Sequence, residues 1–292
     1  MTTDRFIKIL VVITLIEMMA ASGLAVKLED IGRIARNPAL LMRAAIANYA
    51  CVPMVTVGLL LWFGPPPIIS AGFIIVAVCP GAAYGPPFTA IAKGNVAAAV
   101  GLMVILAGSS AICAPVLLRF LLPFMARGQT LRVDALKMVV TLLLSQLLPL
   151  FAGLSVRHWR PALADKLRSP ADRVSATLNL CTLGLILVVY SRTLAAIRAR
   201  AFMGMLALVA AGTVAGWFMG APGSENRRAM SFSTSVRNVA VGLVIATASF
   251  PGTPAVTAAL AYGLFQTVVL AAVALVWGRL GAAEIPARAM LS

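Results

Sequence analysis

The sequence predicts an all-α integral membrane protein with about nine transmembrane helices. Of its 292 residues, 61% are hydrophobic and only 11% are charged, whereas an ordinary soluble domain carries about 25% charged residues. Apolar stretches also recur along the whole chain, and each approaches the roughly 20 residues that cross a bilayer as a helix. Lipid must therefore be the solvent for most of the protein surface.

The apolar stretches give the expected spans. They lie at 6–26, 38–62, 68–92, 95–125, 134–156, 174–196, 201–221, 229–249 and 254–280. We expect the first to be a retained span rather than a cleaved signal peptide, because it is about twenty residues long and carries Glu17 near its centre.

A polar stretch from Arg157 to Arg173 divides the chain near its middle and contains Pro161 and Pro170. We therefore expect a first half at 1–156 with the first five spans, a cytoplasmic connector at 157–173, and a second half at 174–292 with the remaining spans. Two halves of similar layout are typical of secondary transporters that are built from inverted repeats.

Basic residues indicate the topology. The chain has 24 Lys and Arg against 9 Asp and Glu, and they are scattered singly in connectors rather than gathered on an aromatic-rich basic face that would bind nucleic acid. The odd-numbered connections and the C-terminus hold 14 of them, and the remaining connections and the N-terminus hold nine. The positive-inside rule then puts the C-terminus in the cytoplasm and the N-terminus outside. We expect a multi-pass protein of the cell inner (plasma) membrane whose surroundings are the lipid bilayer.

The cysteines and the histidine do not form a metal or catalytic pattern. Cys51, Cys79, Cys113 and Cys181 lie inside apolar stretches without a CxxC pair, and His158 is the single histidine. A metal site or a disulfide framework needs clustered ligands, and the chain contains neither HExxH nor GxSxG. The sequence therefore predicts no metal, no cofactor and no enzyme.

The third apolar stretch is interrupted between Cys79 and Pro87, where nine residues include three prolines and two glycines. Such a segment cannot continue an ordinary helix, and its unpaired backbone groups must face protein or water rather than lipid. The ends of half-helices attract ions, anions at N–H groups and cations at carbonyls. We predict that this break lines a substrate site with Tyr84, Gly85 and Pro86; the alternative is a kink that only shapes packing.

Several of these motifs resemble the bile acid:sodium symporter family. The resemblance rests on Cys79-Pro80-Gly81, on the run from Ala92 to Ala97, on Gly23-Leu24 with Asp30 after it, and on Asn48 ahead of Pro53. It covers nearly the whole chain, which would lack the family's first helix. The resemblance implies two inverted halves, a panel domain and a core domain, two broken helices that cross in the core, and sodium-coupled transport of organic anions.

The chain departs from the family pattern at the ion-binding positions. Gly85 and Pro86 stand where the family has a Ser-Asn pair, and two hydroxyl residues of the following helix are replaced by Ala99 and Met103. The second crossing helix of the family reads Glu-x-Gly-x-Gln-Asn. Here the segment 233–238 keeps only the final asparagine, and the Gly/Pro pair that would break this helix is absent.

Arg237 stands in that segment and puts a permanent positive charge in the place of a mobile cation. Sodium needs several oxygen ligands, and by the resemblance to the family these substitutions remove the carboxylate and most of the oxygens of the site. A fixed cation can do the electrostatic work of a bound ion, but it cannot carry a gradient. The sequence therefore favours a sodium-independent carrier in which Arg237 substitutes for bound sodium.

Three interpretations of Arg237 and Glu17 remain open. An arginine in the middle of a membrane costs about 2.5–3.5 kcal/mol and should face the protein interior. It either pairs with Glu17, or it binds the anionic substrate directly. In the third interpretation Glu17 stands alone and carries a proton, which requires the two residues to be apart.

Further polar residues complete the predicted substrate site. Ser233 and Thr234 precede Arg237, and Asn48 and Asn238 would add to the polar lining. The alternative for the hydroxyl residues is a bond back to the carbonyl four residues earlier. Tyr84 either gates the site and stacks on a ligand, or anchors the chain at the membrane interface.

Together these observations predict a secondary transporter of a small organic anion that works by alternating access without sodium coupling. Two alternatives remain. One is a metalloid (arsenite-like) efflux carrier, because the thiol of Cys79 lies at the break. The other is a non-transporting membrane sensor or scaffold that has kept the fold and lost the ion site.

Overall fold

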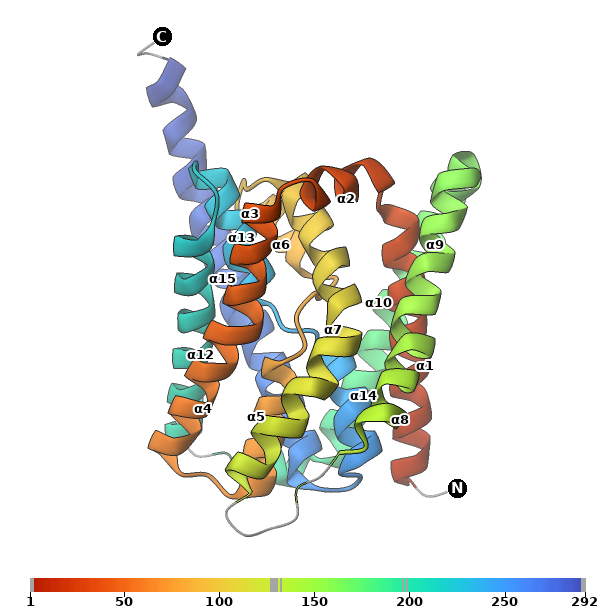
Figure 1. The fold of residues 1–292 in the computed structure, drawn as a ribbon, viewed down its shortest axis with the longest axis vertical. Helices are drawn as coiled ribbons and strands as arrows, with labels where there is room; N and C mark the ends of the chain where they lie inside the picture. The colour runs from red at the N-terminus through yellow and green to blue at the C-terminus, as the bar shows by residue number, and fades with distance from the viewer. Residues whose placement is uncertain (1–2, 127–130, 132, 196, 198, 290–292) are drawn as a thin grey trace.

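The computed structural model describes residues 3–126, 131, 133–195, 197 and 199–289, and within these ranges the chain is helical without a β-strand. Helix α1 begins at one end of the bundle, and the C-terminal helix α15 leaves at the opposite end (Figure 1). Three of the cations counted for topology, Arg127, Arg132 and Arg198, lie outside the described residues.

The elements follow one another through short connections. They are α1 (Thr3–Ala25), α2 (Leu28–Ala35), α3 (Pro38–Ala45), the π-helical turn η1 (Ile46–Cys51), α4 (Val52–Phe63), α5 (Pro67–Ala77), α6 (Gly85–Ile91), α7 (Val96–Met125), α8 (Ala135–Leu142), the π-helical turn η2 (Leu143–Leu147), α9 (Leu148–Trp159), α10 (Pro161–Val189), α11 (Ser191–Ala195), α12 (Ala199–Met219), α13 (Ser224–Ser235), α14 (Val239–Ser249) and α15 (Pro254–Ala289).

Eight helical segments of the described chain are long and apolar enough to cross a membrane. The difference from the expected nine spans arises at the apolar stretch 68–92. It is divided into α5 and α6 by the proline- and glycine-rich break, and neither half is long enough to count as a span.

Two groups of helices make up the bundle (Figure 1). Helices α1, α8–α9 and α10 form one group, which we call the panel, and the remaining long helices form the core. Within the panel α1 packs closely on α9, because Gly23 and Gly153 face each other: a Cβ atom on Gly153 would lie 2.2 Å from the carbonyl oxygen of Ala20. This division agrees with the fold class expected from the sequence.

The polar stretch 157–173, expected as a connector between the two halves, is helical apart from Arg160. Helix α9 continues to Trp159 and α10 begins at Pro161, so that only Arg160 separates them. An ion pair between Arg157 and Asp165 links the two helices. Pro170 lies inside α10.

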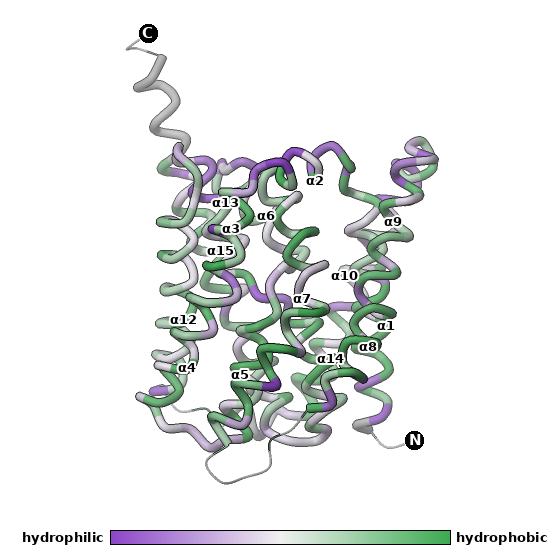
Figure 2. The backbone as a smooth tube through the Cα atoms, viewed as in Figure 1, coloured by the Kyte–Doolittle hydropathy of each residue, from purple (hydrophilic) through white to green (hydrophobic). Residues whose placement is uncertain are grey.

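Large apolar side chains cover much of the outside of the bundle. Trp62, Phe120 and Phe218 are 81%, 69% and 78% exposed. Figure 2 shows hydrophobic residues along the spans and hydrophilic ones concentrated at the end that carries α2. Such a surface is soluble in lipid and not in water, which confirms the membrane assignment.

Candidate functional site

Two broken helices cross inside the core. The first is interrupted between α5 and α6, with Gly81 at φ +80°, and the second between α13 and α14. The breaks are hydrogen-bonded to each other: the backbone N–H of Asn238 donates to the carbonyl of Cys79 at 2.7 Å, and its side-chain Nδ2 to the carbonyl of Gly81 at 3.3 Å. The crossing is therefore a direct contact between two unwound segments.

The second break forms without the glycine and proline whose absence the sequence analysis noted. Val236, Arg237 and Asn238 are not helical. The side chain of Gln266 on α15 accepts from the N–H of Arg237 at 3.0 Å and donates to its carbonyl at 2.9 Å, replacing the lost helical partners. Asn238 then starts α14, because its Oδ1 accepts from the N–H of Val241 at 3.2 Å. A tertiary contact thus stabilises an unwound turn that the local sequence alone would leave helical.

Arg237 lies at this crossing, with 1% of its surface exposed. Its Nη1 donates to the carbonyl of Ala77 at 3.1 Å, and its Nη2 donates to Asn48 Oδ1 at 2.8 Å and to the carbonyl of Thr234. Ala77 ends α5, and Thr234 is in the last turn of α13. The guanidinium therefore lies between the carbonyl ends of two half-helices, which carry partial negative charge.

A second buried arginine caps the other half of the first broken helix. Arg228 on α13 is 5% exposed, and its Nη1 donates to the carbonyl of Ala92 at 3.0 Å, directly after the end of α6. The C-terminal ends of α5 and α6 are thus each bonded to a buried arginine, Arg237 at α5 and Arg228 at α6. Fixed positive charges stabilise helix C-termini in this way.

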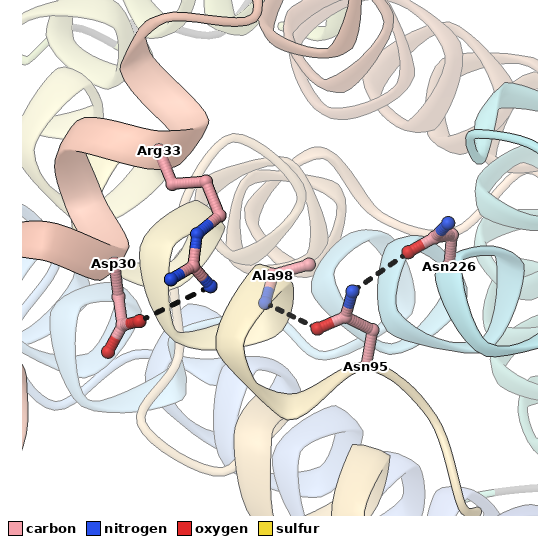
Figure 3. A network of polar contacts seen from close by, with 5 residues as sticks. All are labelled: Asp30, Arg33, Asn95, Ala98 and Asn226. Atoms are coloured by element: carbon pink, nitrogen blue, oxygen red, sulfur yellow. Dashed lines mark hydrogen bonds and ion pairs between the residues drawn. The ribbon is translucent and has the colours of Figure 1, made fainter.

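Asn95, in the run from Ala92 to Ala97 that resembles the family, connects the start of α7 with α13. Its Oδ1 accepts from the N–H of Ala98 at 3.0 Å and caps α7, and its Nδ2 donates to Oδ1 of Asn226 on α13 at 2.9 Å. Figure 3 shows this pair together with the ion pair of Asp30 and Arg33 on α2, 3.7 Å long. The motif therefore has a structural role at the end of the core.

Asn48 reaches Arg237 from a π-helical turn. It lies in η1, and its Nδ2 donates to the carbonyl of Ala44 at 2.9 Å while Oδ1 accepts from Arg237. Pro53 follows in the first turn of α4 and has no N–H for the carbonyl four residues earlier, which favours an irregular turn at this place. The turn thus aims an amide into the core.

Glu17 and Arg237 do not form the ion pair that one interpretation expected. The carboxylate of Glu17, on α1, accepts a hydrogen bond from Ser175 on α10. The acceptors described for Arg237 are carbonyl and amide oxygens. Glu17 is therefore bonded within the panel, whereas Arg237 is bonded at the crossing in the core.

A cavity of about 470 Å³ lies between the panel and the core. Of the predicted site residues, Tyr84 and Pro86 line it. Polar groups at its wall include Ser22 of α1 and three residues of α10: Arg168, Asp172 and Ser175.

The other predicted site residues are buried and do not line this cavity. They are Arg237, Asn238, Ser233, Thr234, Asn48 and Gly85. The hydroxyl groups around them are used in different ways. Ser235, the next hydroxyl residue along the chain, bonds back to the carbonyl of Ser231 at 2.7 Å, whereas Ser233 Oγ has no partner among the described residues.

Helix α10 carries a polar seam that the sequence analysis missed. Its members follow at alternating spacings of four and three residues, which places them on one helix face. They are Arg168, Asp172, Ser175, Asn179 and Thr182. Thr182 bonds to Thr14 on α1 at 2.7 Å, and Asn179 donates to the hydroxyl of Tyr84. This spacing was the available signal, but the first two members were assigned to a connector.

The thiol of Cys79 is fully buried at the crossing. In the part of the chain that the structure describes, no group of three or more His, Cys, Asp or Glu side chains could hold a metal ion. The arsenite-like alternative therefore lacks a cluster of three such ligands among these residues.

Comparisons with known proteins agree with the motifs. A sequence model of the sodium bile acid symporter family matches residues 12–214. The chain is 31% identical over 140 residues to the uncharacterized sodium-dependent transporter YocS of Bacillus subtilis (strain 168). The aligned residues make up 48% of this chain and 42% of that protein. It is 30% identical over 166 residues to the probable chloroplastic sodium/metabolite cotransporter BASS2 of Oryza sativa subsp. japonica. Here the aligned residues make up 56% of this chain and 38% of the relative. These matches span less than half the length of either relative.

Proposed function

Because the chain belongs to the sodium bile acid symporter family, we propose that it is a secondary transporter of a small organic anion that works by alternating access without sodium coupling. Carriers of this type bind their solute where broken helices meet, and one group of helices moves against the other. The cavity between the panel and the core, with Tyr84 and Pro86 of the first break in its wall, is consistent with such a site.

The buried guanidinium of Arg237 is the observation that carries the proposal. It fills the space between two half-helix carbonyl ends, where a mobile cation would otherwise be bound. The ion pairs among the described residues do not include it. Its partners are therefore the partial negative charges of two helix C-termini and the Asn48 amide oxygen, a set of oxygens that would suit a bound cation, and not a carboxylate.

The names of the relatives point to sodium coupling, so coupling is the sharpest test. We expect uptake of organic anions into proteoliposomes to be the same with an inward sodium gradient, an outward one or none. The reason is that Arg237 cannot leave its site, so no sodium ion is carried with the solute. Sodium replaced by choline is the control for ionic strength, and uptake that follows the sodium gradient would overturn the proposal.

We expect Arg168→Gln to raise the KM for anion uptake at least about tenfold with little change in the melting temperature. Arg168 lines the cavity, and its ion pair with Asp172 is weak, 3.9 Å long with both side chains more than half exposed. It is therefore available to a substrate carboxylate. Arg173→Gln, an exposed position of the same helix outside the cavity wall, is the matched control. Equal KM values for the two variants would remove Arg168 from the substrate site.

A proton is the second candidate for a coupled ion. The separation of Glu17 from Arg237 favours it, and so does the contact with Ser175, which lies in the cavity wall next to Asp172 and Arg168. If Glu17 carries the proton, Glu17→Gln abolishes the dependence of uptake on an imposed pH gradient, whereas the exposed Glu29→Gln on α2 keeps it. Intact pH dependence in Glu17→Gln would exclude this role.

The proposed orientation places the N-terminus outside and the C-terminus in the cytoplasm of the cell inner membrane. The cavity wall includes Val26, Val96 and Arg168, which lie where α1 ends and where α7 and α10 begin. This is the end of the bundle from which α15 leaves (Figure 1), so the cavity would lie toward the cytoplasm.

Flux of labelled solute, rather than binding alone, separates the carrier from the sensor or scaffold alternative.

A further inference from the structure

A second and larger cavity, of about 600 Å³, lies inside the core, away from the panel. Helices α4, α5, α12 and α15 line it near the end of the bundle where α4 ends and the other three begin. Its walls are almost entirely apolar and include Leu59, Phe63, Phe73, Met205, Leu208 and Ala261. A polar solute would find few hydrogen-bond partners in such a space, whereas a hydrocarbon chain would fill it favourably.

One cation stands among the residues that line this cavity. Arg200, in the first turn of α12, is exposed, and its guanidinium carbon lies 5.4 Å from the centre of the Phe63 ring. It is the only charged side chain among the described lining residues. Stacking on the ring holds the charge beside the apolar space while the head of the side chain stays accessible.

A buried hydroxyl in the wall lacks a partner. Thr257, three residues after the start of α15, is 4% exposed, and its Oγ1 has no hydrogen-bond partner among the described residues. Thr56, on the α4 side of the same cavity, bonds back to the carbonyl of Val52 at 2.7 Å. Since buried polar atoms are nearly always paired, the Thr257 hydroxyl indicates a ligand or a water that completes the site.

From these observations we propose that the cavity binds a long-chain fatty acid taken from the bilayer. The acyl chain occupies the apolar space, and the carboxylate lies at Arg200. The apolar cavity and its single cation match an apolar tail with one negative head. This site shares no lining residue with the transport cavity, so binding of a fatty acid can be tested independently of the proposed transport function.

The site can be tested with a photoactivatable fatty acid that carries a diazirine in its chain, followed by mass-spectrometric mapping of the adducts on the purified protein. We expect adducts on cavity residues such as Met205 and Leu208, and we expect oleate to compete for them. Adducts that appear equally on the lipid-facing Leu180 of α10, which is 74% exposed, would show unspecific lipid contact and overturn the proposal.

Variants separate the roles of the cavity and of the charge. Arg200→Gln should lower labelling of the cavity at least about tenfold, since it removes the partner of the carboxylate. Gly204→Leu should abolish labelling, because a Cβ atom at Gly204 points toward the Phe63 ring at 3.4 Å and a larger side chain enters the space. Arg192→Gln, an exposed arginine of α11 outside the lining, should label as the wild type does.

The head group is tested with an uncharged fatty-alcohol analogue and with anionic phospholipid. Weak labelling by the alcohol, with strong competition by oleate, supports a carboxylate at Arg200. Equal labelling by the alcohol, or competition by phospholipid vesicles where oleate fails, would overturn the fatty-acid assignment. Unchanged labelling in both Arg200→Gln and Gly204→Leu would overturn the site itself.

Discussion

Replacing Arg237 with alanine is expected to abolish uptake and to lower the melting temperature of the purified protein by many degrees. The substitution leaves three buried acceptors without their donor, the carbonyls of Ala77 and Thr234 and the amide oxygen of Asn48. Each unsatisfied buried acceptor costs about 1–3 kcal/mol. The empty space left by a large buried side chain adds to this loss.

Chemical rescue distinguishes the charge from the volume of the side chain. Guanidinium ion at millimolar concentration should partly restore the melting temperature of Arg237→Ala, because it can occupy the same position between the two helix ends. Arg237→Met fills part of the space without charge and should stay unstable. Arg237→Lys should be intermediate, since an ammonium group keeps the charge but lacks the planar set of donors.

The control for these variants is Arg279→Ala, an exposed position near the end of α15, which should melt with the wild type. The measurement is thermal unfolding in detergent together with uptake in proteoliposomes. Wild-type stability in Arg237→Met would show that the half-helix ends do not need a cation, and the proposed substitution for sodium would then be wrong.

Gly81→Ala should have the second large effect. A Cβ atom at this position would lie 2.2 Å from the nitrogen of Ala107 and 2.8 Å from the carbonyl oxygen of Met103, both on the backbone of α7. The residue also has φ +80°, a conformation that costs an L-residue about 1–2 kcal/mol. Since overpacking adds about 1–3 kcal/mol, the break should move away from α7 and lose the bond between Gly81 and Asn238.

Gly85→Ala is the matched control for stability, because it lies in the same segment and a Cβ atom there meets nothing within 4 Å. We expect its melting temperature to stay close to that of the wild type, while Gly81→Ala gives little folded protein in size-exclusion chromatography. Similar melting temperatures for the two variants would mean that the close contact between the break and α7 is not required.

The membrane helices and the first break could be predicted because their signals are local. Hydropathy over about 20 residues identifies a span, and the prolines and glycines between Cys79 and Pro87 interrupt one wherever they occur. The second break could not be predicted in this way. It depends on Gln266, which is 29 residues away and supplies the hydrogen bonds that the helix would otherwise make.

The candidate site shows the same limit. The sequence indicated that Arg237 must face the interior, because lipid cannot solvate its charge. It left open whether Arg237 pairs with Glu17, whether it binds the substrate, or whether Glu17 stands alone and carries a proton. The structure shows the carbonyls of two half-helices and the amide of Asn48 as partners, and it places Glu17 beside Ser175 of α10. The polar seam of α10 was missed because hydropathy alone separated a polar connector from an apolar span.

Three properties of this protein follow from the order of its amino acids: lipid as its solvent, the number and place of its apolar stretches to within one broken span, and the family motifs around Cys79 and Asn95. Hydropathy and the effects of proline and glycine on a helix act over short stretches of chain, so the order of the residues is enough to recognise them. The packed helices were needed to show which oxygens surround Arg237, why the segment 236–238 unwinds, and which side chains line the cavity between panel and core. These depend on hydrogen bonds between residues far apart in the chain, and such bonds form only after the helices have packed.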